Sequence, residues 1–355
     1  MVPIPSFFLP RILTGSGHGA LRRQGGWVIW VLVVLGVVLG AGRMPAQSFP
    51  VRVQTIDLKK GWNAVFLEVE PLDTRPSAVF EGTPVDVVAQ FTRPVRTAQF
   101  ETDPGKILAN NEGWAVWYAP DREESFLSGL YGLHSHNALL VHSREAFQWK
   151  VTGQVYLKRI FWKADSFNLV GFPVNPAVAP TFSQYFEGKP AHAGKPVFRI
   201  VDGVWRKVEN PASTVMKRGE AYWVYCQGGS DYQGPAEVRL AYGDHLRYTA
   251  ELTTSALVLK NRSLHPAGLT ITQSAQNGLP MAVLLKGVMD TGLVGISTPL
   301  PAAYTMPAME AGASGTLNLQ VGGTTLPSEG GSNLLRIASD AGTEFWVAAW
   351  LEPRD

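Results

Sequence analysis

The chain has 355 residues, of which 45% are apolar and only 17% are charged, so it can build packed cores and is not a disordered protein. Its 31 basic and 29 acidic residues give a net charge of +2 without a basic block, which excludes a nucleic-acid-binding protein that relies on positive charge. The length predicts two or three domains, and the 36 glycines and 25 prolines favour short strands joined by turns.

The first 46 residues have the composition of a secretory signal peptide. They contain four arginines and no acidic residue, and the apolar run from Trp27 to Ala41 is followed by small residues around Ala46. This arrangement predicts export, with cleavage near Ala46. The alternative is an uncleaved membrane anchor, which usually needs about 20 apolar residues. After cleavage, 27 basic and 29 acidic residues remain, so we expect no nucleic-acid partner and no integral membrane span.

Two stretches of the sequence resemble each other and predict a duplicated unit. GWNAVFLEVEP (61–71) matches SFNLVGFPVNP (166–176) at a spacing of 105, and residues 138–157 match residues 221–240 at a spacing of 83. We therefore predict one β module over 47–158, with an insertion near 104–128, and a second over 159–248. A competing alignment pairs residues 113–117 with 219–223.

The repeated segments have the pattern of β-strands. Apolar residues alternate along 62–70, with Val65, Leu67 and Val69 on the more apolar face. Asp202 and Gly203 separate two apolar runs and predict a two-residue β-hairpin. Each module is therefore expected to be a small antiparallel β unit.

Residues 249–355 do not repeat this pattern. Short apolar or alternating runs recur there, separated by turn sequences such as Asn277-Gly278 and Gly322-Gly323. This spacing predicts an antiparallel, immunoglobulin-like β-sandwich. The predicted fold class is all-β: two related antiparallel modules followed by a sandwich.

The GWNAV opening, the FEGTP turn (80–84) and the AYWVY strand (221–225) support a family resemblance. Residues 54–240 resemble modules of exported bacterial proteins that carry "GWN-x-V" openings and "G-x-AYW" strands. The resemblance implies a secreted β module and assigns no activity, cofactor or catalytic residue.

Histidines and paired carboxylates are the first candidates for chemistry. His134 and His136 could share one strand face and approach a metal, with His142 as a third ligand if the strand were straight. A turn around Asn137 argues against this, so we expect solvated loop histidines, one strand histidine and no metal ligands. Glu68 and Glu70 are expected to lie on a solvated strand face.

Other signatures of catalysis do not occur in the sequence. There is no G-x-S-x-G elbow, H-E-x-x-H helix, phosphate-binding loop, dinucleotide fingerprint or calcium loop. The single cysteine, Cys226, cannot form an intrachain disulfide and is expected to be buried and unreactive. We therefore predict a protein without catalytic residues or cofactor.

Aromatic residues are the remaining functional signal. Nine tryptophans follow the predicted signal peptide, and Trp62, Trp149 and Trp223 match large apolar residues in the other module, which indicates core positions. Trp114 and Trp117 lie in a segment that only the first module carries. With Tyr118 and Tyr131 they are the predicted binding surface, and the alternative is that this segment packs as extra strands.

These observations favour an exported, non-catalytic structural, adhesive or recognition protein of the bacterial surface or periplasm. Its expected partner is a protein or a glycan, bound by an aromatic patch or by strand addition at a sheet edge. The alternative is a carbohydrate-binding accessory protein, and a glycoside hydrolase is the third possibility.

Overall fold

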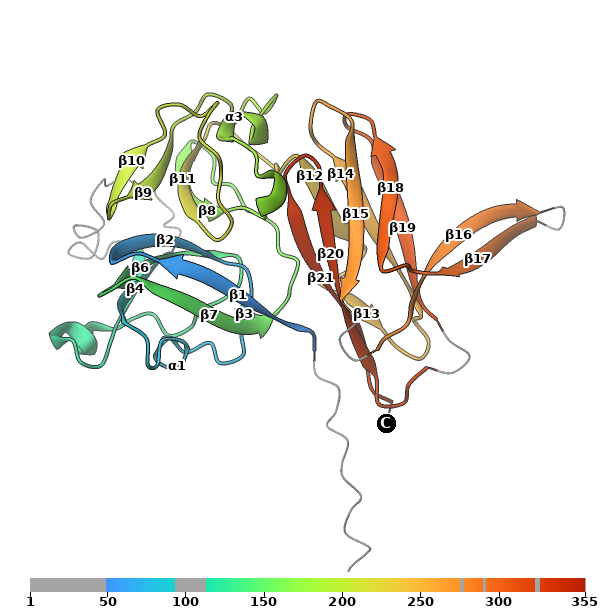
Figure 1. The fold of residues 1–355 in the computed structure, drawn as a ribbon, viewed down its shortest axis with the longest axis horizontal. Coiled ribbons are helices and arrows are strands. Elements are labelled where there is room, and N and C mark those ends of the chain that lie inside the picture. The colour runs from blue at the N-terminus through green and yellow to red at the C-terminus, as the bar shows by residue number, and fades with distance from the viewer. Residues whose placement is uncertain (1–48, 93–112, 275–277, 290–291, 323–325, 355) are drawn as a thin grey trace, which may run out of the picture. The chain divides into compact units, whose positions relative to one another are not determined.

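The computed structural model describes residues 49–92, 113–274, 278–289, 292–322 and 326–354 (Figure 1). Strands dominate these residues, which confirms the predicted all-β fold class. The helices have at most five residues each: α1 (Pro76–Val79), η1 (Glu123–Leu127), η2 (Pro176–Val178) and α3 (Phe182–Tyr185). The predicted signal peptide, residues 1–46, lies outside the described residues. Within the described part of the chain, no helix has the length and apolar character needed to cross a membrane.

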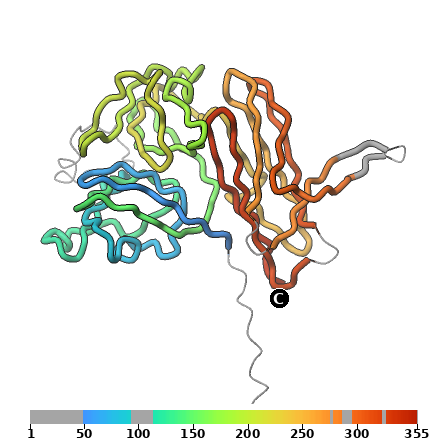
Figure 2. The backbone as a smooth tube through the Cα atoms, in the orientation of Figure 1, coloured from blue at the N-terminus to red at the C-terminus, as the bar shows by residue number. Residues whose placement is uncertain are grey.

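The first module consists of two antiparallel sheets around one apolar core. One sheet has the order β1 (Val51–Leu58), β7 (Phe147–Gln154), β3 (Glu70–Pro71). The other has the order β2 (Gly61–Leu67), β6 (Asn137–Ser143), β4 (Val85–Phe91), β5 (Trp114–Tyr118). Figure 2 shows the blue β1 running beside the green β7, which follows it much later in the chain. Trp149 of β7 is buried in this core, with its ring 4.8 Å from that of Phe80.

The second module is built on one four-stranded antiparallel sheet. Its order is β8 (Ser166–Gly171), β11 (Ala221–Cys226), β9 (Val197–Val201), β10 (Val204–Lys207). The predicted hairpin joins β9 to β10, and both Asp202 and Gly203 have the positive φ that this tight turn requires. Cys226 is buried, as predicted, and burial raises the pKa of its thiol.

The two four-stranded sheets share one strand order and one register. Phe66 of β2 lies opposite Ala138 of β6, and Gly171 of β8 lies opposite Ala221 of β11. These pairs are related by the sequence offsets of 105 and 83 residues. β9 and β10 occupy the places of β4 and β5. Trp114 therefore lies in β5, which has β10 as its counterpart in the second module, and not in an insertion as we expected. Residues 104–112 of that predicted insertion lie outside the described residues.

The two four-stranded sheets pack face to face through a shared apolar layer. Strand alternation directs Val65 and Leu67 into the first module's core, whereas Ala64 and Phe66 face the second module. The Phe66 ring lies directly on the backbone of Gly171, where a built Cβ would overlap the ring. The backbone N–H of Phe66 also donates to the carbonyl of Gly219 (2.8 Å). The sheets approach this closely because residue 171 has no side chain.

The C-terminal unit is a sandwich of two five-stranded sheets around a single apolar core, as the sequence predicted. The first sheet has the order β12 (Ala236–Leu240), β14 (Thr254–Asn261), β19 (Ser314–Val321), β16 (Met281–Met289), β17 (Gly292–Pro299). The second has the order β13 (Leu246–Tyr248), β21 (Glu344–Leu351), β20 (Gly331–Ser339), β15 (Ala267–Ser274), β18 (Ala303–Met309). The structure places β12 and β13 in the sandwich, so this unit begins before the predicted boundary at 248.

We expect the contact between Phe66 and Gly171 to control the stability of the paired modules. Gly171→Ala should lower the free energy of unfolding by about 1–3 kcal/mol, because the added methyl group overpacks the layer between the sheets. Gly129→Ala is the matched control, since a Cβ at Gly129 meets no atom within 4 Å. Urea denaturation of both variants checks this prediction, and equal stabilities would contradict it.

Candidate functional site

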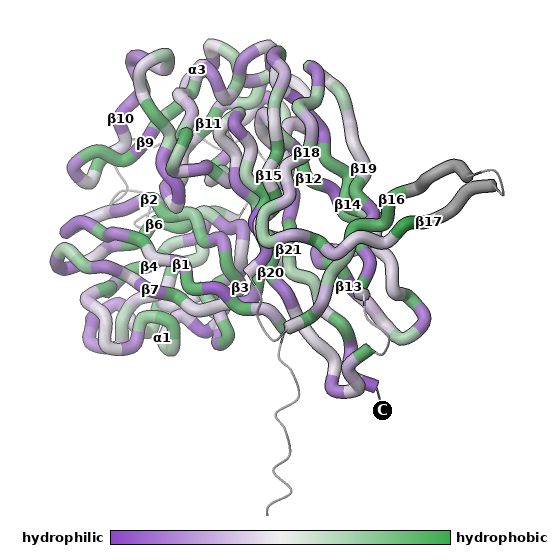
Figure 3. Tube along the Cα trace, turned by 45° about the vertical axis from the view of Figure 1, so that its right-hand side comes forward, coloured by the Kyte–Doolittle hydropathy of each residue, from purple (hydrophilic) through white to green (hydrophobic). Residues whose placement is uncertain are grey.

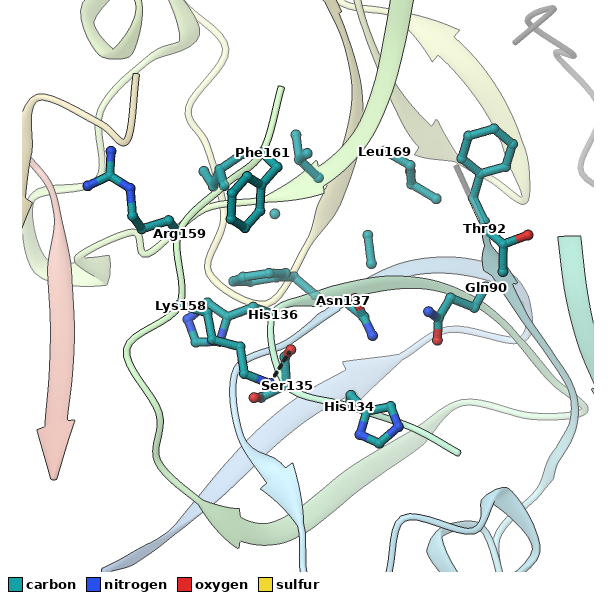
Figure 4. Close-up of a pocket in the computed structure, with 16 residues that line it drawn as sticks. Gln90, Thr92, His134, Ser135, His136, Asn137, Lys158, Arg159, Phe161 and Leu169 are labelled. Carbon is teal, nitrogen blue, oxygen red and sulfur yellow. Dashed lines mark hydrogen bonds between the residues drawn. The ribbon is translucent and has the colours of Figure 1, made fainter. Parts of the chain in front are cut away.

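A pocket of about 540 Å³ opens where the layer between the two four-stranded sheets reaches the surface (Figure 4). We call it the interlayer pocket. The end of β4, the turn before β6, the segment that enters the second module and strand β8 all line it. Its polar lining residues are Gln90, Thr92, His134, Ser135, His136, Asn137, Lys158 and Arg159, and its aromatic ones are Phe66, Phe91 and Phe161.

The turn before β6 brings several polar side chains to the pocket. His136 has a left-handed backbone conformation (φ 63°) and donates its N–H to the carbonyl of Leu67 (2.6 Å). Strand β6 then begins at Asn137. The predicted turn therefore lies at Ser135 and His136, just before Asn137, where it was expected. It places the imidazole of His136 beside the Phe66 ring, with the ring centroids 5.7 Å apart.

Glu70 anchors one wall of the pocket. Its carboxylate accepts from the backbone N–H and hydroxyl of Ser135 (2.7 and 2.9 Å), and it pairs with Nδ1 of His134 (2.6 Å) and Nζ of Lys158 (3.2 Å). Burial raises the pKa of Glu70, but these hydrogen bonds and the charge of Lys158 outweigh burial and lower it to about 2. So acidic a carboxyl group is a poor general base near neutral pH.

Two residues that line the pocket each carry a buried side-chain atom that has no hydrogen-bond partner among the described residues. These atoms are Oε1 of Gln90 and Nδ1 of His136. Burial lowers the pKa of His136 to about 4, so its imidazole is neutral at physiological pH. A buried polar group without a partner costs about 1–3 kcal/mol, and such groups are normally satisfied by protein, water or ligand. Gln90 and His136 are therefore the lining residues with unused hydrogen-bonding capacity.

The basic residues of the pocket already have carboxylate partners. Lys158 pairs with Glu70, and its ammonium also donates to the carbonyl of Ser135 (3.5 Å; Figure 4). Arg159 pairs with the buried carboxylate of Glu237 (2.7 Å). The pocket thus combines neutral polar groups with balanced charges, which suits an uncharged polar ligand better than an anion.

An exposed aromatic ring adds an apolar surface to the pocket. Phe161 is 69% exposed, although it lies between the partly buried Ile160 and Trp162. Phe91 also lines the pocket, and its ring packs against Trp114 (5.2 Å) and Trp223 (5.1 Å). Aromatic surface beside neutral hydrogen-bonding groups can bind a ligand that has both polar edges and apolar faces.

The four predicted binding residues do not form one exposed surface. Trp117 is buried in the first module's core, where its ring stacks on Phe80 (5.7 Å). Tyr118 is buried on the opposite side of the same strand, because successive strand residues face opposite ways. Trp114 is half-buried in the layer between the sheets, and only Tyr131 is well exposed. The predicted aromatic patch is therefore wrong, and the alternative of packed strand residues describes this segment.

The three candidate histidines make separate contacts. His134 pairs with Glu70, and His136 packs on Phe66. His142 of β6 pairs through Nδ1 with the buried carboxylate of Asp86 (2.6 Å), which two arginines also contact. Within the described ranges, no cluster of three histidine, cysteine, aspartate or glutamate side chains could hold a metal ion. His136 is half-buried and was wrongly expected to be solvated.

Glu68 was also wrongly expected to lie on a solvated strand face. It is buried and forms ion pairs with Arg52 (2.5 Å) of the first module and Arg218 (2.8 Å) of the second. Arg218 also pairs with Glu344 of the sandwich, which Arg336 holds from the other side. This cluster, Arg52–Glu68–Arg218–Glu344–Arg336, joins all three units. A glutamate inside the apolar run FLEVEP was the only sequence signal for it.

No family model matches the chain, and no curated protein matches it. Among solved structures, it is similar to a chain of the Salmonella enterica SafA pilin in complex with the SafB chaperone, at 16% identity and a TM-score of 0.22, over 33% of this chain and 54% of that one. The PapD-like domain of human CEP192 is 14% identical at a TM-score of 0.21, over 34% and 86% of the two chains. A β-glucosidase from Listeria innocua is 10% identical at a TM-score of 0.18, over 49% and 22%. Similarity at this level assigns no activity to the chain.

Two buried histidines should make stability depend on pH. Burial lowers the pKa of both His136 and His192 from 6.5 to about 4. Between these values the unfolded chain binds protons that the folded chain does not, so stability is full above about pH 6.5 and falls as the pH drops to about 4. Each histidine should contribute at most about 3 kcal/mol to this loss.

Variants at these positions check the prediction. His136→Asn keeps a residue that tolerates the left-handed conformation, and His192→Gln keeps a polar side chain. Each should flatten the dependence of unfolding free energy on pH, measured by urea denaturation between about pH 7 and pH 4. An unchanged slope in both variants would show that neither histidine is held neutral by burial.

Proposed function

We propose that this chain is an exported recognition protein that binds its ligand non-covalently in the interlayer pocket. The observation that carries this proposal is the pair of buried atoms without partners, Oε1 of Gln90 and Nδ1 of His136, beside the exposed ring of Phe161. Each of these groups would gain a contact when a ligand binds. The proposed binding involves no covalent step, and the carboxylate of Glu70 serves to hold Ser135, His134 and Lys158 in place.

The chemistry of the pocket favours a neutral, polyhydroxylated ligand such as a glycan. The Gln90 oxygen can accept a hydrogen bond from a hydroxyl group, and a neutral imidazole can accept or donate one. The Phe161 ring offers a face on which the apolar side of a sugar ring can pack. An anionic ligand would have to compete with Glu70 and Glu237 for Lys158 and Arg159.

Export and the arrangement of two related modules complete the proposal. The signal-like composition of residues 1–46 and the resemblance of residues 54–240 to exported bacterial proteins support a periplasmic or cell-surface location. The shared strand order and register of the two four-stranded sheets support descent from one duplicated module. A structural or adhesive role that uses a protein partner is the second candidate, favoured by a sheet edge of the C-terminal sandwich.

Binding should depend on the pocket residues and not on exposed aromatic surface in general. On a glycan array, we expect selective binding by the purified chain, and a loss of about 10-fold or more in affinity for both Gln90→Leu and Phe161→Ala. Removing one hydrogen bond to a ligand or one stacking contact has about this effect.

Phe126→Ala is the matched control, because Phe126 is 82% exposed and does not line the pocket. It should bind as the unmodified chain does. Unchanged glycan binding by both pocket variants would show that the interlayer pocket is not the binding site. Absence of binding to every neutral glycan would contradict the proposed ligand class.

A further inference from the structure

One edge of the sandwich lacks the features that normally prevent edge strands from pairing. The sandwich sheets end at four strands, β12, β17, β13 and β18. β18 contains Pro307 and a register shift, β13 has only three residues, and β12 carries Glu237 and Arg239. β17 has eight residues, no charge, and a proline only at its last position. Charge, proline, shortness and bulges are the usual protection against edge pairing, so β17 is open to another strand.

β17 also belongs to a two-stranded ribbon that extends beyond its sheet. β16 pairs with β17 in continuous register from Ala282 opposite Pro299 to Met289 opposite Gly292, but with β19 only over 281–283 (Figure 1). Leu285 and Ile296 lie opposite each other on the ribbon and are 49% and 45% exposed. Figure 3 shows hydrophobic positions of β16 and β17 where the ribbon leaves the sandwich. An isolated two-stranded ribbon is only marginally stable in water, so an additional strand would stabilise it.

The backbone of β17 shows which groups such a strand would meet. Leu300 donates its N–H to the carbonyl of Met281 (2.8 Å), which sets the alternation of the antiparallel ladder between β16 and β17. In this alternation, the backbone groups of residues 293, 295 and 297 point away from β16, toward the free edge. The edge therefore offers three sets of donors and acceptors, spaced symmetrically about Gly295.

We propose that β17 pairs antiparallel with β17 of a second copy of this chain, with the two-fold axis at Gly295. Residue 295 then faces its own equivalent, and residues 293 and 297 exchange backbone hydrogen bonds across the axis, so the outward groups of these three residues are all paired. Two features of the strand favour a second copy as its occupant. No charged residue lies within 292–299, so self-pairing brings no like charges together, and the residue on the axis has no side chain.

The oligomeric state of the exported full chain tests this proposal. Analytical ultracentrifugation should give a dimer for the unmodified chain and a halved mass for Ser297→Pro, because proline removes an outward N–H that the ribbon itself does not use. Ser297→Ala, the matched control, keeps this N–H and should remain dimeric. Circular dichroism should show that both variants are folded. A monomeric unmodified chain, as expected if β17 binds a strand of a different protein, would overturn the proposal, as would a folded Ser297→Pro dimer.

Cysteine cross-linking tests the register independently. Cys226, the only cysteine of the chain, is buried, so an introduced cysteine provides the single accessible thiol. Gly295→Cys should form a disulfide-linked dimer under oxidation, because residues directly opposite each other in a hydrogen-bonded pair lie about 5.5 Å apart at Cα. The two copies of Thr298→Cys would be roughly 20 Å apart and should not cross-link. Equal cross-linking of both variants, or cross-linking of Thr298→Cys alone, would overturn the proposed axis.

Discussion

The close contact between Phe66 and Gly171 is the constraint on which the rest of the two-module unit depends. The ring can lie on the backbone of Gly171 only because that position lacks a side chain, and this brings two four-stranded sheets together over one apolar layer. The layer is closed over most of its area by large side chains. Where it reaches the surface beside His136 and Phe161, the same approach of the sheets leaves the interlayer pocket.

The ion-pair cluster around Glu68 and Arg218 fixes how the units are aligned, which the apolar layer alone does not determine. An apolar contact has no preferred direction, whereas buried charges have to meet their partners. Arg218 reaches Glu68 in the first module and Glu344 in the sandwich, so a shift of one unit against another would break one of these buried ion pairs. Glu70 follows Glu68 by two residues and accepts a hydrogen bond from Ser135 in the turn that lines the pocket. By fixing Glu68, the cluster therefore also helps to hold this wall of the interlayer pocket in place.

Sequence pattern predicted the fold well because strand alternation and turn residues act locally. The repeated strand segments, the Asp202-Gly203 hairpin and the buried Cys226 were all readable in this way. The candidate site could not be predicted in this way, because it depends on contacts between residues that are far apart in the sequence. Trp117 and Tyr118 looked alike in the sequence, yet the packing of sheets on both sides of β5 buries them in different cores. Of the partners of Glu68, Arg218 lies 150 residues away and Arg52 lies on another strand, so no local pattern could identify them.

The side-chain NMR signals of Gln90 and His136 test the central claim most directly, because both report on the buried polar atoms of the interlayer pocket. On titration with a glycan that binds, the Gln90 amide and the His136 imidazole signals should shift together and saturate at one ligand per chain. A glycan that binds while both signals stay unchanged would place recognition elsewhere on the molecule and contradict the account.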